Sequence, residues 1–406
     1  MGEHEPRISK ELLSASGEDG QDLHEVRCDE CHACADVFRI RKQELEAFTA
    51  RVLQAHQVPA EEAEITARVL VSADLRGVAS HGVARLGRYI SGLDAGYIRP
   101  GVAFDIQEPA PAIGVIDAKN GIGQVASEQA MDMAISKARA NGIGLVTVRN
   151  SNHYGIAGYY VLKALAQRMI GVCMTNSAPL VIPTHGAKAL LGTNPIAFGA
   201  PAAKNQAFLL DMATSVVPRG KLEVYDRNRK QMPVGWTVDE QGFDCQNPGQ
   251  VLRNLIDRVG GGILPLGGRG ETFSGYKGYG LAALVDVLCG VLSGSAFLDD
   301  VHNLKREVPE GEIAAPRVGH IFMAVDVGRF QPIEAFEQSM DEFIDRLKAS
   351  PKAVDQDEIL VAGEKEWRRT AESERLGVPI AANVMKTLLE IARRCQAEPP
   401  RCVEQA

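Results

Sequence analysis

The chain lacks the long apolar run that a membrane-spanning helix requires. Such a helix needs about 18 or more predominantly apolar residues, and the nearest approach, residues 281–292, contains Asp286. We therefore expect this segment to form a buried core helix. The first residues, Met1-Gly-Glu-His-Glu-Pro6, contain no apolar stretch, so we expect neither a secretory signal nor a transit peptide. These absences predict a cytoplasmic protein with no membrane partner.

The chain also lacks an excess of basic residues. Its 44 Lys and Arg residues are outnumbered by 52 Asp and Glu residues, which gives a formal net charge of −8 at pH 7. Proteins that bind nucleic acid or anionic membranes usually carry the opposite balance, because they must neutralise phosphates. We therefore expect no nucleic-acid partner and a small metabolite as substrate.

Cysteines are few, with eight in 406 residues, as is usual in a reducing compartment. Three of them form Cys28-Asp-Glu-Cys31-His-Ala-Cys34, a spacing that resembles zinc and iron–sulfur sites. An iron–sulfur run would place its next cysteine at position 38, which is Phe38. The surrounding residues 1–36 are polar and acidic, so we expect a disordered leader that holds no metal.

A chain of 406 residues exceeds what one ordinary hydrophobic core supports and indicates more than one domain. Helical spacing of apolar residues marks two helices after residue 37 and two more near the C-terminus, and we expect both pairs to pack together. Between them, short β-branched runs alternate with helical patterns. We therefore expect an α/β protein with a central domain at 112–327, flanked by helical parts at 37–111 and 328–406.

Polar side chains follow successive strand predictions in the central segment. A β-branched run at 145–148 is followed by Arg149-Asn-Ser-Asn-His153-Tyr-Gly155. A later apolar run ends in Asp211-Met212-Ala213-Thr214-Ser215. Because α/β proteins usually place their chemistry at strand ends, both groups are candidate site residues.

A third polar group combines a hydroxyl, an imidazole and a guanidinium in Ser80-His81-Gly-Val-Ala-Arg85, with Tyr89 close behind. Adjacent Ser and His side chains diverge, so they do not form a nucleophile and its base by themselves. A hydrolase using Ser80 should also carry a G-x-S-x-G elbow, and the chain has none. The residue types fit proton transfer and anion binding better.

Gly121-Ile-Gly123-Gln-Val-Ala126 matches the dinucleotide-binding pattern G-x-G-x-x-A. However, three residues separate it from the strand predicted to end at Asp117. The next strand ends in Arg149-Asn150, without the acidic residue that would bind ribose hydroxyls. From these residues alone, both a Rossmann phosphate loop and a structural turn before a helix remain open.

Several motifs together resemble the type-2 malate/L-lactate dehydrogenase family, in the right order and with consistent spacing from about Val37 to the C-terminal helices. They are Asp74-Leu-Arg-Gly-Val-Ala-Ser-His-Gly-Val-Ala-Arg85, Arg149-Asn-Ser-Asn-His-Tyr-Gly155, Gly192-Thr-Asn-Pro195, Asp211-Met-Ala-Thr-Ser215, Leu264-Pro-Leu-Gly-Gly268 and Lys277-Gly-Tyr-Gly280. Relatives with similar motifs include ureidoglycolate dehydrogenase, sulfolactate dehydrogenase and 2,3-diketogulonate reductase.

This resemblance implies a homodimeric oxidoreductase that uses NAD or NADP. It also implies a cofactor-binding domain that is not a Rossmann fold, built on a largely antiparallel sheet, with a helical domain from the N- and C-terminal segments. The glycines at 121 and 123 would then be structural. Residues implied to line the cofactor are Ser177, Asp211, Met212, Ala213, Thr214, Tyr276, Lys277, Gly363, Glu364 and Lys365.

The resemblance also places Ser80, His81, Arg85, Tyr89 and His153 around the substrate. Oxidation of a 2-hydroxy acid requires a base for the hydroxyl proton, and histidine has a pKa near neutrality. Arginine suits the carboxylate because its planar fork binds both oxygens. Either His81 or His153 fills the acid/base role in different members; we favour His153, with His81 and Ser80 polarising the substrate oxygen.

Three alternatives stay open at this point. The protein is a dehydrogenase of a small 2-hydroxy acid, a reductase of a cyclic imino acid or diketo sugar acid, or a non-catalytic relative that binds NAD(P). A non-catalytic relative should have lost a key side chain, yet Ser80, His81, Arg85, His153 and Lys277 are all present.

Overall fold

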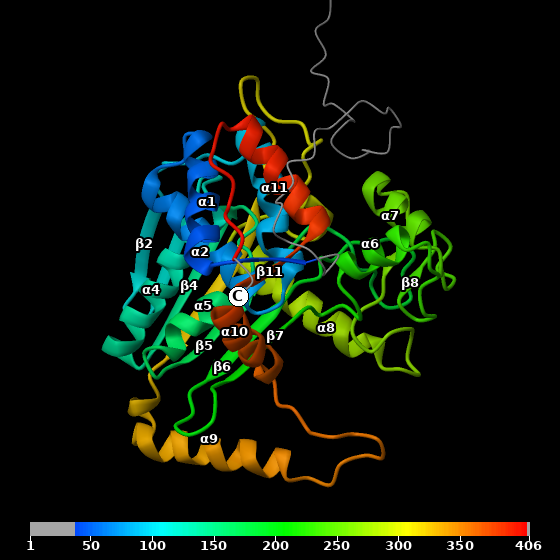
Figure 1. Cartoon of the computed structure of the whole chain (residues 1–406). Helices are drawn as coiled ribbons and strands as arrows, with labels where there is room; N and C mark the ends of the chain where they lie inside the picture. Colours follow the sequence, from blue (N-terminus) through cyan, green and yellow to red (C-terminus); the bar gives the residue numbers. More distant parts are fainter. Residues whose placement is uncertain (1–36, 404–406) are drawn as a thin grey trace, which may run out of the picture. The chain divides into compact units, whose positions relative to one another are not determined.

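The computed structural model describes residues 37–403, which form one compact unit (Figure 1). The expected leader at 1–36, including Cys28, Cys31 and Cys34, lies outside the described residues. Among the described residues, no group of three or more His, Cys, Asp or Glu side chains is placed to hold a metal ion.

A seven-stranded mixed sheet forms the centre of this unit, in the order β2-β3-β4-β10-β5-β6-β7. Its pairs are antiparallel except for β3 and β4, which are parallel. The strands are β2 (Asp105–Ala110), β3 (Ile113–Asp117), β4 (Ile143–Ser151), β5 (Ile170–Thr175), β6 (Ile196–Ala200), β7 (Phe208–Met212) and β10 (Val318–Val325). The expected α/β class and largely antiparallel sheet are therefore confirmed.

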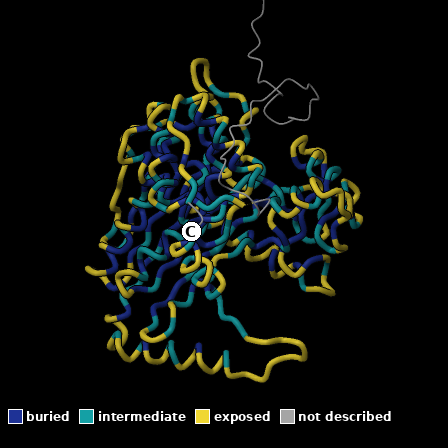
Figure 2. Tube along the Cα trace, in the orientation of Figure 1, coloured by how far each residue is buried: buried dark blue, intermediate teal, exposed yellow. Residues whose placement is uncertain are grey.

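Helices α4 (Gly123–Asn141) and α5 (Ala157–Leu165) cover one face of the sheet. Their small apolar residues pack on Val146, Val148 and Phe322, so close approach of helix and sheet is possible. Figure 2 shows the buried segments in dark blue through the interior of the described chain. Helix α8 (Gly275–Asp286), continued by the π-helical turn η4 (Val287–Leu292), packs on the opposite face through Val285 and Cys289.

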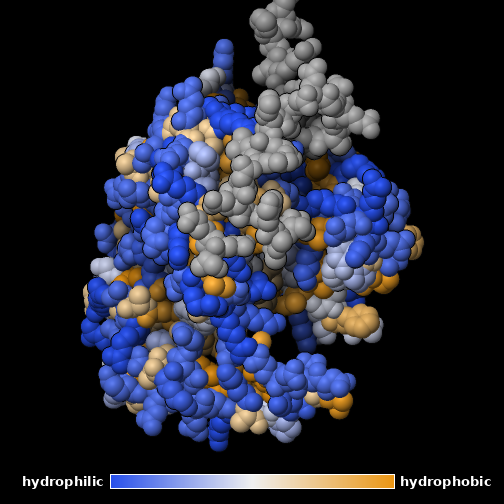
Figure 3. All heavy atoms as spheres, viewed as in Figure 1, coloured by the Kyte–Doolittle hydropathy of each residue, from blue (hydrophilic) through white to orange (hydrophobic). Residues whose placement is uncertain are grey.

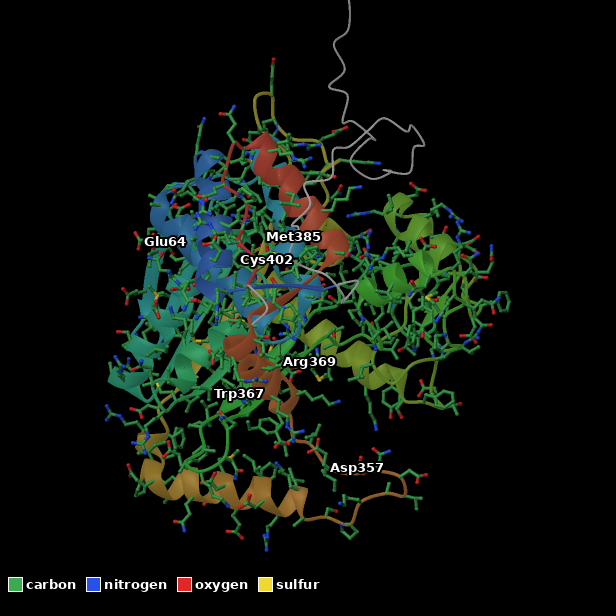
Figure 4. The ribbon with its side chains drawn as sticks, viewed as in Figure 1. Glu64, Asp357, Trp367, Arg369, Met385 and Cys402 are labelled. Carbon is green, nitrogen blue, oxygen red and sulfur yellow. The ribbon has the colours of Figure 1, made fainter. Side chains whose placement is uncertain are left out.

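A second core joins the two ends of the described chain. It combines residues of α1 (Lys42–Ala55), α2 (Ala60–Leu75), α3 (Leu86–Asp94) and α11 (Ala382–Arg394) with the two-stranded sheet of β1 (Val37–Ile40) and β11 (Val378–Ala381). Phe48 and Leu70 lie at its centre with no exposed surface. Helix α10 (Glu364–Leu376), which carries Trp367 and Arg369 (Figure 4), connects this core to β7, because the Trp367 indole donates to the Ala207 carbonyl.

A third core lies in the segment that joins β7 to α8. It contains α6 (Arg219–Arg227), α7 (Pro248–Asp257) and the short pair β8 (Thr237–Val238) and β9 (Gly262–Ile263). Leu222, Val251 and Ile263 have no exposed surface. The sequence motifs did not reveal this separate core, because its strands are only two residues long.

The expectation that residues 281–292 are buried all round was wrong. Leu284, Val287, Val291 and Leu292 are 45–58% exposed, whereas Val285 and Cys289 are fully buried. By length and composition alone Gly275–Leu292 would suffice to cross a membrane, yet 39% of it is buried within the protein. Its Asp286 carboxylate accepts from the Asn176 amide and the Leu298 N–H, which ties the helix into the fold.

Helix α9 (Ile333–Lys348) also departs from expectation. It does not pack on α1 and α2; it lies beside the loops that join α5 to β5 and β6 to β7 (Figure 1). Arg168 pairs with Glu334 and Glu337, and Asp341 accepts from two backbone N–H groups of the β6–β7 loop. Of its apolar residues only Ile344 is buried, and Phe343 and Leu347 are exposed. The face of the molecule that Figure 3 shows is mainly hydrophilic.

Candidate active site

The structure links all five expected substrate-side residues by direct contacts. The Tyr89 hydroxyl lies 2.6 Å from His153 Nδ1, and the rings of His153 and His81 are stacked with centroids 5.6 Å apart. His81 Nδ1 in turn lies 2.9 Å from Ser80 Oγ, so the expectation that these adjacent side chains diverge was wrong. We call Ser80, His81, Arg85, Tyr89 and His153 the histidine cluster.

Two short segments position this cluster. His153 comes two residues after the end of β4, and the turn containing Ser80 and His81 follows α2. Asp74, near the end of α2, accepts a hydrogen bond from the Val83 N–H at 2.7 Å. A Cβ atom on Gly82 would lie 2.0 Å from the Asp74 carboxylate, so only glycine lets the turn approach its anchor. Burial raises the pKa of Asp74 to about 7, and the Val83 hydrogen bond opposes that shift.

Cations surround the two histidines. The Arg85 Nε donates to the Ser80 carbonyl at 2.6 Å, which leaves the outer guanidinium nitrogens available. Burial and the nearby charges of Arg85 and Arg88 lower the pKa of His81 to about 4. Burial, followed by Arg88, His81 and Arg85, holds the pKa of His153 well below its usual range. Both imidazoles are therefore neutral at pH 7 before an anion binds.

A cleft of about 1050 Å³ opens beside this cluster. Ser80 and Arg85 line one wall, α6 contributes Lys221, and the start of α11 closes another side. The Lys221 ammonium lies 5.5 Å from the Trp236 ring centroid. This cleft has room for a small acid next to Arg85.

A second polar group forms where the ends of β5 and β7 lie beside the start of β6. The Thr193 N–H donates to Ser177 Oγ, the Ser177 N–H donates to Asn194 Oδ1, and Thr214 Oγ1 lies 3.1 Å from the carbonyls of Thr193 and Asn194. We call Ser177, Thr193, Asn194 and Thr214 the hydroxyl cluster. Ser177 and Thr214, both expected at the cofactor, thus belong to one network.

Asp211, another residue expected at the cofactor, lies in β7, three residues before Thr214. Its carboxylate accepts from the Gly158 N–H at 2.7 Å, in the first turn of α5. Solvent reaches Asp211, but the surrounding protein desolvates it and raises its pKa to about 6; Gly158 and Arg76 oppose this shift. Arg76 is buried, and its guanidinium carbon lies 4.7 Å from the Trp367 ring centroid.

The other expected cofactor residues occupy two neighbouring places. Gly363 packs on Leu209 of β7, so the turn at Gly363, Glu364 and Lys365 lies beside the strand that carries Asp211 and Met212. At the start of α8, Gly278 packs on Leu266, whose N–H donates to the Thr214 carbonyl. Tyr276 and Lys277 therefore lie near the hydroxyl cluster. No contact joins these residues directly to His153 among residues 37–403.

The glycine pattern at Gly121 and Gly123 occupies a buried position. A Cβ atom on Gly123 would lie 2.3 Å from the Asn152 carbonyl oxygen, and the neighbouring Ile122 and Gln124 are almost fully buried. The first turn of α4 therefore packs against the segment that leads into His153. These glycines permit close helix–strand packing.

Sequence reasoning missed Arg88, Lys221 and Asp74 as contributors to the site. Arg88 follows Arg85 by three residues, a helical spacing that would have placed both on one face. Asp74 was visible as part of a motif, but its role depends on a backbone contact nine residues away. Lys221 carried no local signal, because α6 reaches the cleft only through tertiary packing.

Stacked imidazoles next to an arginine, beside a cleft of a mixed α/β protein, are the residue types that proton transfer on a carboxylate-bearing substrate requires. The comparisons specify the class further. Residues 40–389 match the family described as malate/L-lactate dehydrogenase. The chain therefore belongs to this family and is a nicotinamide-dependent 2-hydroxy-acid dehydrogenase, which confirms the resemblance seen in its motifs.

Individual relatives support this family assignment. A malate dehydrogenase of Pyrococcus abyssi is 46% identical over 356 residues, covering 88% of this chain and 94% of the relative. A malate/(S)-sulfolactate dehydrogenase of Methanothermus fervidus is 34% identical over 88% of this chain and 98% of the relative. The solved structure of malate dehydrogenase from Pyrococcus horikoshii is 42% identical, with a TM-score of 0.80 over 89% of this chain and 97% of that one.

Proposed function

We propose that this enzyme interconverts malate and oxaloacetate, with the histidine cluster as its catalytic centre. The observation that carries the proposal is the contact of Tyr89, His153 and His81 next to Arg85. The relatives named malate dehydrogenase support the choice of substrate.

In this proposal, Arg85 binds the carboxylate on the carbon next to the reacting centre. Its Nε is held by the Ser80 carbonyl, so the outer two nitrogens are oriented for a two-pronged contact. In this proposal His153 carries its ring proton on Nδ1 and donates it to the Tyr89 hydroxyl oxygen, which fixes the ring and leaves the unprotonated Nε2 for the substrate hydroxyl. His81, held by Ser80, donates toward the same substrate oxygen.

His153 takes the hydroxyl proton at Nε2 as the base of the oxidation. Its low pKa keeps it unprotonated in the free enzyme, and an anionic substrate that neutralises nearby cations raises its affinity for the proton. The bound nicotinamide supplies the hydride acceptor. Reduction uses the same groups in reverse, with protonated His153 as the acid.

The cofactor fits best along the hydroxyl cluster, Asp211 and the turn at 363–365. Asp211 keeps solvent access although protein surrounds it, and among the described residues the ammonium groups of Lys277 and Lys365 make no hydrogen bond or ion pair. We propose that they face the cofactor phosphates. Gly123 packs on the Asn152 backbone, which leaves little room for a pyrophosphate at the first turn of α4 and supports a cofactor site that is not of the Rossmann type.

The decisive experiment measures the loss of NADH and of NADPH absorbance with a panel of 2-oxo acids and one cyclic imino acid. We expect oxaloacetate to give the highest kcat/KM. Preference for the cyclic imino acid would overturn the proposal, and so would a lack of turnover with every member of the panel. The same assay decides between NAD and NADP.

We also propose that the enzyme is a homodimer whose interface includes the exposed apolar side of α8 and η4. Leu284, Val287 and Val291 recur at three- and four-residue spacing, so they form one stripe. A second copy would remove this stripe from water. Val287→Lys should reduce the molar mass measured by light scattering to that of a monomer, whereas Val234→Lys, at another exposed valine, should not.

A further inference from the structure

We propose that His320 is a positioning residue that holds His153 and the hydroxyl cluster at a fixed separation, so that substrate and cofactor meet at the distance that hydride transfer needs. This inference rests on the proposed function and concerns a fully buried side chain that the proposed chemistry does not use. The observation that carries it is that both ring nitrogens of His320 are hydrogen-bonded, each to a different neighbouring strand.

The place of His320 in the sheet allows it to join two strand ends. Strand β10 lies between β4 and β5 and runs antiparallel to both, so β4 and β5 end at the same edge. His320 Nε2 lies 2.9 Å from Ser151 Oγ, in the last residue of β4, and Nδ1 lies 2.7 Å from Thr175 Oγ1, in the last residue of β5. His153 follows Ser151 by two residues, and Ser177 follows Thr175 by two. One imidazole therefore ties the strand that leads to the proposed base to the strand that leads to the proposed cofactor site.

A β-bulge directs the His320 ring at these hydroxyls. The pairing of β10 with β4 shifts its register between Val318 and His320, and bulges commonly redirect a side chain next to an active site. Gly319, between them, donates to Asn176 Oδ1 at 2.9 Å. A Cβ atom on Gly319 would overlap the Cys289 carbonyl oxygen, so this bulge requires glycine.

The hydrogen bonds of His320 run in one direction. The Thr175 hydroxyl donates its single hydrogen to the Asn176 carbonyl at 2.8 Å, so it accepts from His320 Nδ1. Burial lowers the pKa of His320 to about 3 against the opposing Asn152 carbonyl, and the ring is neutral. Nε2 of a neutral ring protonated on Nδ1 is an acceptor, so the Ser151 hydroxyl donates to it. His320 therefore acts as a spacer and not as an acid or base.

Tyr154 adds a second contact to the same segment. Its buried ring lies parallel to that of His320, with an interplanar angle of 1° and centroids 4.6 Å apart. Ser151 and Tyr154 lie on either side of His153 in the sequence, so His320 contacts the chain both before and after the proposed base. A misplacement of about 1 Å at a reacting group lowers the rate about a hundred-fold.

The test removes one hydrogen bond at a time. Ser151→Ala and Thr175→Val each delete a hydroxyl that contacts His320, with little change in volume. In single turnovers with malate, we expect each to slow formation of the reduced cofactor about ten- to a hundred-fold, with the KM for malate within a few-fold of wild type. A primary isotope effect with malate deuterated at C2 identifies the slowed step as hydride transfer. Val146→Ala, buried in the middle of β4, should lower the unfolding temperature and leave this rate unchanged.

The double variant Ser151→Ala/Thr175→Val separates positioning from general destabilisation. If His320 joins the two strand ends, the double variant should lose little more than the more damaging single variant, because the first deletion already breaks the link. His320→Asn still reaches Thr175 but is too short for Ser151, so it should match Ser151→Ala.

Two outcomes would overturn the role of His320 while the proposed function stands. They are losses that multiply in the double variant, and single-turnover rates that stay close to wild type in both single variants. If wild type did not oxidise malate, the proposed function would fail and the role of His320 with it.

Discussion

The histidine cluster and the hydroxyl cluster differ in how many of their polar groups have hydrogen-bond partners within the protein. In the hydroxyl cluster, Ser177, Thr193 and Thr214 are held by backbone and side-chain hydrogen bonds. At the histidine cluster, by contrast, Arg85 is held only at Nε and keeps its outer guanidinium nitrogens available. A satisfied network is preorganised and rigid, whereas an uncompensated cationic group gains stability when an anion binds.

The largest expected effect comes from removing the proposed base. His153→Ala should lower kcat about a hundred- to ten-thousand-fold, because general base catalysis typically contributes that much. NADH affinity should persist, since the hydroxyl cluster does not touch His153. Steady-state kinetics and NADH fluorescence check this. If His153→Ala stayed within a few-fold of wild type and His81→Ala were inactive, the two histidines would exchange roles.

Asp74 tests how the histidine cluster is anchored. Because burial raises its pKa to about 7, its contribution to stability is complete below its unfolded pKa near 4 and is lost as the pH rises through 7. Asp74→Asn can still accept from the Val83 N–H. Relative to wild type, the variant's free energy of unfolding should therefore rise by about 2–3 kcal/mol from pH 5 to pH 8 in urea titrations. A constant difference across that range would contradict this.

Arg85→Lys tests whether Arg85 belongs to the substrate site and not to the cofactor site. Lysine keeps the charge but loses the two-pronged geometry, so kcat/KM should fall about ten- to a hundred-fold. NADH affinity should barely change. Titration with NADH and then with a 2-oxo acid checks both; weakened NADH binding with unchanged 2-oxo-acid binding would move Arg85 out of the substrate site.

Thr214→Val should have the smallest effect of these variants. It should lower the free energy of unfolding and leave the preference among 2-oxo acids unchanged. The buried hydroxyl lies against two carbonyls, and its removal should cost about 1–2 kcal/mol of unfolding free energy. Thermal unfolding and NADH titration measure it. If the variant kept wild-type stability but changed the preference for oxaloacetate over pyruvate, the separation of the two clusters would be wrong.

The motifs predicted much of the candidate site, because local sequence carries both the residue type and its place at a strand or helix end. His153 after β4, Ser177 after β5 and Asp211 within β7 lie where the alternating patterns placed them. Periodicity also predicted α1, α2, α4 and α11. The domain boundaries at 112 and 327 stay a prediction.

Sequence by itself determined the α/β class, the family and the residues that we propose to react, since these depend on residue type and short-range spacing. Only the tertiary structure decided that Tyr89 meets His153 across 64 residues and that Asp74 anchors the Ser80 turn. It also decided that one side of α8 and η4 is exposed. Burial and charge compensation depend on every element packed nearby, and a pattern along one segment does not contain that information.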